Sequence, residues 1–264
     1  MKKININIIV ATHKKYKMPE DEIYLPMQLG SEGKNDLGYQ KDNQGDNISL
    51  KNLYYCELTG LYWAWKNLNA DYIGLSHYRR HFTCSNKIPK NENDKFEILL
   101  NKQQVEEILE KTDIILPRKR KYYIENLYDH YKHTMHGETL DETRKIIEEK
   151  YPEYLVEFEK LHERTSAHMF NMFIMKKEYL NKYCEWMFNI LFELEKRIDP
   201  KKYDSFHARY LGRISELLLD VWINTNKLNY EEIKVIDMQN VNWIKKGTAF
   251  LMAKFTGKKY GKSF

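Results

Sequence analysis

The order of strand and helix patterns in the first 76 residues constrains the fold more than any other feature of the chain. Residues 4 to 10 form a β-branched apolar run, which is typical of a first sheet strand. Residues 15 to 50 are rich in Gly, Asp, Asn and Lys and predict a long loop. Residues 45 to 68 repeat apolar side chains every three or four positions, as an amphipathic helix does, and Tyr72–Ser76 is a second apolar run. This order predicts a βα unit with parallel strands.

The rest of the chain continues the alternation. The predicted helices are residues 102–111, 139–163 with an interruption at Pro152, 177–197 and 210–226, and the predicted strands are Asp113–Leu116, Met172–Met175 and Lys234–Met238. A basic, aromatic and histidine-rich stretch at 118–138 predicts a loop or lid. We therefore expect one α/β, Rossmann-like domain over residues 1–240, with a mostly parallel central sheet flanked by helices.

Positive charge is concentrated at the C-terminal end. The chain carries a net charge of +5, yet from Met238 onward it has no acidic residue and six lysines, which are Lys245, Lys246, Lys254, Lys258, Lys259 and Lys262. Bulky apolar residues alternate with these lysines, a pattern that suits an anionic membrane surface. The sequence predicts a basic amphipathic tail, 241–264, that contacts such a membrane through residues 243–264; a solvated lysine-rich terminus is the alternative. No nucleic-acid-binding module accompanies the charge, so nucleic acid is not an expected partner.

Missing motifs exclude several classes of protein. The three cysteines, Cys56, Cys84 and Cys184, show no CxxC spacing, which argues against a disulfide framework or a zinc site and fits a reducing cytoplasm. Neither GxGxxG nor GxxxxGK[ST] occurs, and HExxH and GxSxG are also absent. These absences disfavour dinucleotide-binding, P-loop, zincin and α/β-hydrolase proteins. No run approaches the roughly 20 apolar residues that a membrane helix needs.

Polar and cationic residues follow two predicted strands directly. Thr12, His13 and Lys14 come after the first strand, and the segment DYIGLSHYRRHF places His77, Tyr78, Arg79 and Arg80 after the second. In open α/β sheets, ligands bind outside the carboxyl ends of strands. Guanidinium groups bind diphosphate oxygens in a bidentate manner and can neutralise a leaving pyrophosphate without a metal. Structural ion pairs with nearby acids are the alternative for both arginines.

Three segments carry a resemblance to a known family. They are the stretch from IIVATHKK to LTGLYWAWKN (residues 8–67), DYIGLSHYRRHF, and MFIMKKEYLNKYCEWMF. The chain resembles short bacterial glycosyltransferases of capsular and exopolysaccharide loci, a family long filed as a domain of unknown function. The resemblance implies a single GT-A-like domain that moves a hexose, with galactose and galactofuranose as candidates, from a nucleotide diphosphate sugar, UDP-linked by expectation, to a lipid-linked oligosaccharide. The scattered thiols and the basic tail predict a cytoplasmic protein that is peripheral on the inner face of the cell membrane. A non-catalytic carbohydrate- or nucleotide-binding scaffold of polysaccharide assembly is the alternative.

The resemblance also suggests roles for individual residues. Thr12 and His13 would line the nucleotide pocket, and Asp46, followed by Asn47, would contact the ribose or base or orient a catalytic group; an ordinary helix cap is the alternative for Asp46. His77-Tyr78-Arg79 stands where such enzymes usually carry an Asp-x-Asp metal site. We therefore expect no cofactor, with a Mn²⁺ or Mg²⁺ ion held unconventionally as the alternative.

An inverting transfer needs a base that deprotonates the acceptor hydroxyl. Glu216 is the candidate because it lies near the start of a helix that is otherwise apolar, and Asp220 is the second choice. A surface glutamate is the alternative. His168 and Asn171 resemble donor-sugar contacts, with core or loop roles equally open. The catalytic candidates are thus Glu216, Asp46 and His77.

Overall fold

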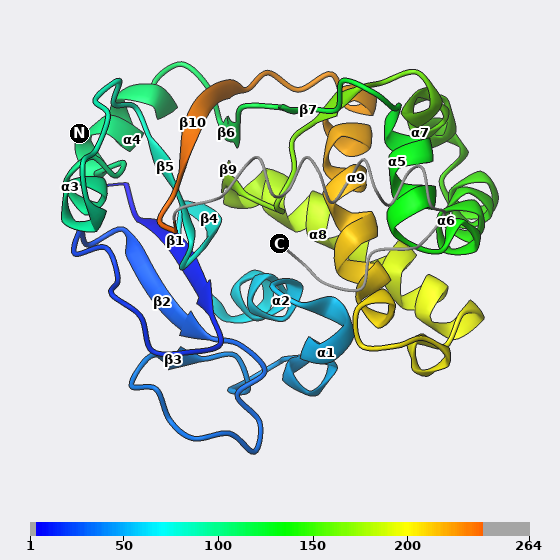
Figure 1. Ribbon diagram of the computed structural model, residues 1–264, viewed down its shortest axis with the longest axis horizontal. Helices are drawn as coiled ribbons and strands as arrows, with labels where there is room; N and C mark the ends of the chain where they lie inside the picture. Colours follow the sequence, from blue (N-terminus) through cyan, green and yellow to red (C-terminus); the bar gives the residue numbers. More distant parts are fainter. Residues whose placement is uncertain (1–3, 240–264) are drawn as a thin grey trace.

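An eight-stranded sheet runs through the computed structural model, which describes residues 4–239 (Figure 1). Its strands, in spatial order, are β3 (Gln40–Lys41), β2 (Tyr24–Gln28), β1 (Ile6–Thr12), β4 (Tyr72–His77), β5 (Arg80–Thr83), β10 (Glu231–Asp237), β6 (Ile114–Pro117) and β9 (Phe173–Lys176). Two further strands, β7 (Arg120–Lys121) and β8 (Ser166–Ala167), form a separate antiparallel pair. The α/β class is confirmed.

The prediction of a mostly parallel sheet is wrong, because the sheet is mixed. Within residues 4–239, β1–β2, β1–β4, β2–β3 and β6–β10 pair in parallel, whereas β4–β5, β4–β9, β5–β10 and β6–β9 are antiparallel. The reason lies in the chain itself: only Tyr78 and Arg79 separate β4 from β5, and so short a turn can join only antiparallel strands. β4 pairs with β9 through Tyr72–Leu75 and with β5 at His77, so β4, β5, β10, β6 and β9 form a closed ring of pairings.

Helices cover the sheet on both faces. They are α1 (Asn52–Tyr55), α2 (Leu58–Asn67), α3 (Glu92–Glu97), α4 (Lys102–Leu109), α5 (Leu127–Thr134), α6 (Gly137–Lys150), α7 (Leu155–Glu159), α8 (Lys177–Arg197) and α9 (Tyr210–Thr225). Residues of β1 alternate between two apolar clusters, as strand geometry requires. Ile9 belongs to the cluster that contains residues of α2, α8 and α9, while Ile8 belongs to the cluster that contains Val105 of α4. In Figure 1, α5 to α9 gather on the side of the molecule away from β1 to β3.

Several predicted elements are confirmed and others are corrected. The helices predicted at 177–197 and 210–226 match α8 and α9 closely. The single helix predicted over 45–68 is wrong, since α1 ends at Tyr55, Cys56 takes a positive φ of 51°, and α2 begins at Leu58. The predicted loop at 15–50 contains β2 and β3, and the predicted lid at 118–138 contains β7 and α5. Short strands and helices of this kind carry too few periods to be recognised from the sequence.

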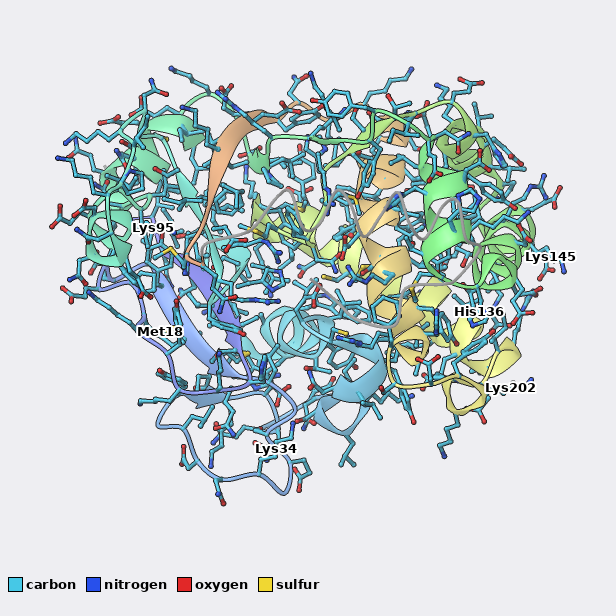
Figure 2. The ribbon with its side chains drawn as sticks, in the orientation of Figure 1. Met18, Lys34, Lys95, His136, Lys145 and Lys202 are labelled. Carbon is cyan, nitrogen blue, oxygen red and sulfur yellow. The ribbon has the colours of Figure 1, made fainter. Side chains whose placement is uncertain are left out.

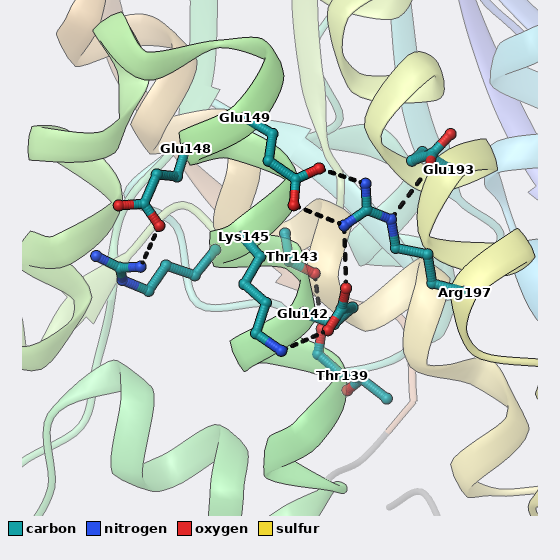
Figure 3. Close-up of polar contacts among 9 residues, drawn as sticks. Thr139, Glu142, Thr143, Lys145, Glu148, Glu149, Glu193 and Arg197 are labelled. Atoms are coloured by element: carbon teal, nitrogen blue, oxygen red, sulfur yellow. Dashed lines mark hydrogen bonds and ion pairs between the residues drawn. The ribbon is translucent and has the colours of Figure 1, made fainter.

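Half-buried ion pairs connect the outer helices. Arg197 of α8 donates hydrogen bonds to Glu142 and Glu149 of α6 and to Glu193 of its own helix (Figure 3). Figure 2 shows Lys34, Lys145 and Lys202 at the outer edge of the molecule. Within residues 4–239, no helix is both long and apolar enough to cross a bilayer. The boundary predicted at residue 240 and the membrane contact predicted for 243–264 concern a segment outside the described residues.

Candidate active site

The structure brings the two predicted strand ends together. Tyr78, in the turn that follows β4, donates its backbone N–H to the carbonyl of Ala11 at the end of β1 (3.1 Å). The buried Tyr78 ring meets the His13 ring edge to face, with centroids 5.5 Å apart, and the Lys14 ammonium lies 5.2 Å from the Tyr78 centroid. Burial and then the charge of Lys14 lower the pKa of His13. Thr12 is buried, and its hydroxyl bonds the backbone of Lys14, which fixes this strand end.

Phe170 joins this edge of the sheet to the rest of the site. Its carbonyl accepts a hydrogen bond from Nε2 of His77 (2.7 Å). Its ring lies 4.3 Å from the Arg80 guanidinium and 6.0 Å from that of Arg120. Two guanidinium groups from distant segments therefore contact one aromatic ring, a favourable arrangement for each cation.

The positive charge of this cluster is only partly neutralised. Arg80 faces Asp237 across 3.6 Å, too long for a hydrogen bond. Within residues 4–239, Arg79 and Arg120 form no salt bridge, and Arg79 lies over the Tyr78 ring at 5.5 Å. Burial lowers the pKa of Arg80, Asp237 raises it, and the charges of Arg79 and Arg120 lower it further. Gathered like charges favour an anionic ligand, because the ligand removes their mutual repulsion.

Glu216 faces inward, so the alternative of a surface glutamate is wrong. The residue is 5% exposed on α9 and accepts a hydrogen bond from Nη1 of Arg213 (3.2 Å). Its carboxylate is the main cause of the raised pKa of Arg213 and also raises that of Arg80. Glu216 thus belongs to the same electrostatic cluster as the arginines.

His168 and Asn171 are buried and bonded within the protein. The His168 backbone N–H and Nδ1–H both donate to Asp220 of α9, and its Nε2 contacts Glu232 of β10 at 2.8 Å. The Asn171 amide donates to Glu57 (2.6 Å) and to the Gly212 carbonyl (3.2 Å). With 0% and 2% of their surfaces exposed, these two side chains fix the segment that carries Phe170.

Asp46 and Asn47 form hydrogen bonds with residues other than the arginines of the cluster. The Asp46 carboxylate accepts a hydrogen bond from the Tyr62 hydroxyl (3.2 Å), and its backbone is bonded to the Asn67 side chain, both in α2. Asn47 bonds the Gly45 carbonyl. The acidic residue that organises this region is Asp42, four positions earlier, which is fully buried and accepts five hydrogen bonds.

Sequence reasoning missed Arg120, Arg213 and Phe170. Arg213 had a local signal, since it precedes Glu216 by three residues on one helix face. Arg120 and Phe170 had none, because only tertiary structure brings them to Arg80. In the described part of the chain, no group of three or more His, Cys, Asp or Glu side chains is arranged to hold a metal ion.

Comparisons with known proteins place the chain in a family. It is similar to the apo structure of WbbM, a bifunctional glycosyltransferase, with 32% sequence identity and a TM-score of 0.81 over 89% of this chain. The match covers 46% of the WbbM chain, so this chain spans about half of that protein. A search of curated proteins found no match. A family model described as a domain of unknown function matches residues 7–227, which confirms the resemblance inferred from the sequence. The chain therefore belongs to the DUF4422 family of domains of unknown function.

Proposed function

We propose that this chain is a glycosyltransferase that takes its sugar from a nucleotide diphosphate sugar and delivers it to a glycan acceptor. The likeness to WbbM at 32% identity supports the reaction class. The observation that carries the proposal is the arginine cluster at the carboxyl end of β4, in which Arg80 and Arg120 contact the Phe170 ring and Arg79 lies over the Tyr78 ring.

The cluster suits a donor diphosphate. Arg80, Arg79 and Arg120 would bind the diphosphate oxygens and stabilise the charge that develops as the sugar leaves. The ligand would replace Asp237 as the main partner of Arg80, since the 3.6 Å ion pair is loose. Thr12, His13, Lys14 and Tyr78 form the adjacent strand end and would line the nucleotide side.

The remaining predicted residues take supporting parts in the proposal. His77 holds the Phe170 carbonyl in place, and His168 and Asn171 fix the same segment from within the core. Asp46 and Asn47 stay predictions as nucleotide contacts. The transfer also needs a base that activates the acceptor, the role for which the sequence predicted Glu216.

The donor and acceptor are proposed from the family resemblance. A UDP-linked hexose, with galactose and galactofuranose as candidates, is the expected donor, and a lipid-linked oligosaccharide of capsular or exopolysaccharide synthesis is the expected acceptor. In this proposal the enzyme works on the inner face of the cell membrane, with residues 243–264 contacting anionic lipid.

The test measures donor binding and turnover separately. Wild-type protein is screened by thermal shift against UDP-, GDP- and CMP-sugars, and release of the nucleoside phosphate is then followed with the best donor. Loss of a charged hydrogen bond costs about 1.5–3 kcal/mol, so Arg80→Ala and Arg79→Ala should each weaken nucleotide binding about 10- to 100-fold.

Arg144→Ala is the matched control, since Arg144 pairs with Glu148 and Glu159 on the outside of α6 and α7. Unchanged binding and turnover in both Arg79 and Arg80 variants would remove the diphosphate site. Binding of a donor without release of any nucleoside phosphate, with or without acceptor glycans, would support the scaffold alternative instead.

A further inference from the structure

Two strained backbone segments meet beside the arginine cluster. Cys56, in the break between α1 and α2, has φ 51° and ψ −128°, and Phe170 has φ 77°. Such conformations cost about 1–3 kcal/mol in residues other than glycine and persist only where surrounding structure enforces them. They concentrate at functional sites, so the groups held between these two segments are of interest.

The side chain held between them is Glu57. This residue is the N-cap of α2, where a carboxylate usually accepts hydrogen bonds from the first turn of the helix. Glu57 makes no such bond. Its carboxylate points instead to Asn171, whose Nδ2 donates to Glu57 Oε1 at 2.6 Å. The break at Cys56 thus turns Glu57 away from its own helix and toward the segment that carries Phe170.

The orientation of Asn171 is fixed on every side. Its Nδ2 donates to two groups that can only accept, Glu57 Oε1 and the Gly212 carbonyl, and its Oδ1 accepts from the Ser215 hydroxyl (3.0 Å). Asn171 itself is buried, with 2% of its surface exposed. A buried amide with no freedom to rotate is a rigid support for one carboxylate oxygen and leaves the other oxygen of Glu57 unused by this contact.

Glu57 and Glu216 differ in their partners. Both carboxylates raise the pKa of Arg213, so both lie near that guanidinium. Glu216 is 5% exposed and bonded to Arg213, whereas Glu57 is half-buried and bonded to a neutral amide. A base must reach the acceptor hydroxyl and offer it a lone pair, which the more exposed carboxylate does better.

We propose that Glu57, rather than Glu216, is the catalytic base of the transfer, and that Glu216 positions Arg213. This inference rests on the proposed function. In the step, the acceptor O–H proton passes to the Glu57 carboxylate while the acceptor oxygen bonds to the anomeric carbon. The bond from that carbon to the diphosphate oxygen breaks, and its electron pair leaves with the nucleoside diphosphate beside the arginines.

The test compares Glu57→Gln, Glu57→Asp and Glu216→Gln, with Glu153→Gln on the protein surface as control. Melting temperature, affinity for the nucleoside diphosphate, and the pH profile of kcat are measured for each. Glu57→Gln should keep nucleotide affinity within about twofold, lose at least about 100-fold in kcat, and lose the acidic limb of the profile. Glu57→Asp should keep that limb at a reduced rate. Glu216→Gln should keep the limb but weaken nucleotide binding.

Four outcomes would overturn the inference. The first two concern Glu57→Gln: a normal kcat, or a loss of nucleotide affinity as large as the loss of kcat. The third is an acidic limb that disappears only in Glu216→Gln, and the fourth, if Glu57→Gln does not fold, is a Glu57→Asp profile without that limb. The third would return the base to Glu216. None of these outcomes touches the proposed function, which fails separately if the wild-type protein releases no nucleoside phosphate from any sugar nucleotide.

Discussion

Replacing Asp42 with asparagine is expected to destabilise the protein by about 3 kcal/mol, through hydrogen bonds that a neutral amide cannot accept. The Asp42 carboxylate is fully buried. Its Oδ2 accepts from the Gly30 N–H (2.7 Å) and the Thr59 hydroxyl (2.7 Å), and its Oδ1 accepts from the Ser31 N–H (3.0 Å), the Ser31 hydroxyl (2.9 Å) and the Ser49 hydroxyl (2.6 Å). These donors come from the loop after β2, the turn before α1, and α2, so one carboxylate joins three segments.

The magnitude follows from these contacts. An amide nitrogen placed at Oδ2, the oxygen with fewer bonds, leaves the Gly30 N–H without an acceptor, which costs about 1–3 kcal/mol in a buried position. The Thr59 hydroxyl can turn to the Cys56 carbonyl at 3.2 Å and loses little. The three hydrogen bonds to Oδ1 are then made to a neutral amide oxygen and lose about half their strength, about 0.5–1 kcal/mol each. Relief of a buried charge offsets part of this, which leaves about 3 kcal/mol.

The assay is urea unfolding followed by tryptophan fluorescence, which five tryptophans provide. For a chain of this size, about 3 kcal/mol lowers the melting temperature by about 6–12 °C. Asp46→Asn is the matched control, because it makes the same chemical change in an exposed side chain whose carboxylate accepts, among residues 4–239, one hydrogen bond, from Tyr62 at 3.2 Å. It should cost less than about 0.5 kcal/mol. The loss of one buried acceptor costs at least about 1 kcal/mol. The reasoning is refuted if the unfolding free energy of Asp42→Asn lies within about 1 kcal/mol of the wild-type value, or if Asp46→Asn lowers it more than Asp42→Asn does.

Three further predictions concern pH, salt and metal. Burial lowers the pKa of His81 to about 3, so its neutral form stabilises the fold fully above pH 6.5, and this contribution is lost as the pH falls toward 3. Between pH 7.5 and pH 5, His81→Phe should lose about 2 kcal/mol less unfolding free energy than the wild type, as measured by urea titration at both pH values; equal losses would contradict it. Arg197→Ala removes the partly exposed ion pairs with Glu142, Glu149 and Glu193 and should cost about 1 kcal/mol at low salt and less in 1 M NaCl. A loss that does not depend on salt would exclude ion pairing as its cause. Sugar transfer should persist in excess EDTA and gain nothing from Mn²⁺, and abolition by EDTA would show that a metal is required.

The long elements of the fold could be predicted, and the short ones could not. The β1 and β4 runs and the α8 and α9 helices carry enough apolar periods to be recognised. β5 follows β4 after two residues, and the sequence HYRRHF gives no turn signal that would separate them. Because this turn was not recognised, the antiparallel pairing of β4 with β5 was not predicted.

The candidate site divides in the same way. Arg79 and Arg80 were found because they follow a buried strand directly, so that local sequence and fold agree on their place. Arg120 contacts the Phe170 ring and Glu57 bonds Asn171, and each contact joins segments far apart in the sequence, so no local pattern predicts it. Asp46 was predicted from the family resemblance of its segment, whereas burial, which distinguishes Asp42, is a property of the folded chain.

The distribution of glycine gives an independent reason to look for function at these segments. Where loops need a positive φ, the chain uses Gly30 and Gly45, at 53° and 63°. At Cys56 and Phe170, with comparable angles, it does not, although glycine would adopt them without strain. A side chain at these positions must therefore contribute more than the strain costs. For Phe170 the contribution is visible, since its ring contacts Arg80 and Arg120, and a glycine there would relax the backbone while removing the surface on which both cations rest.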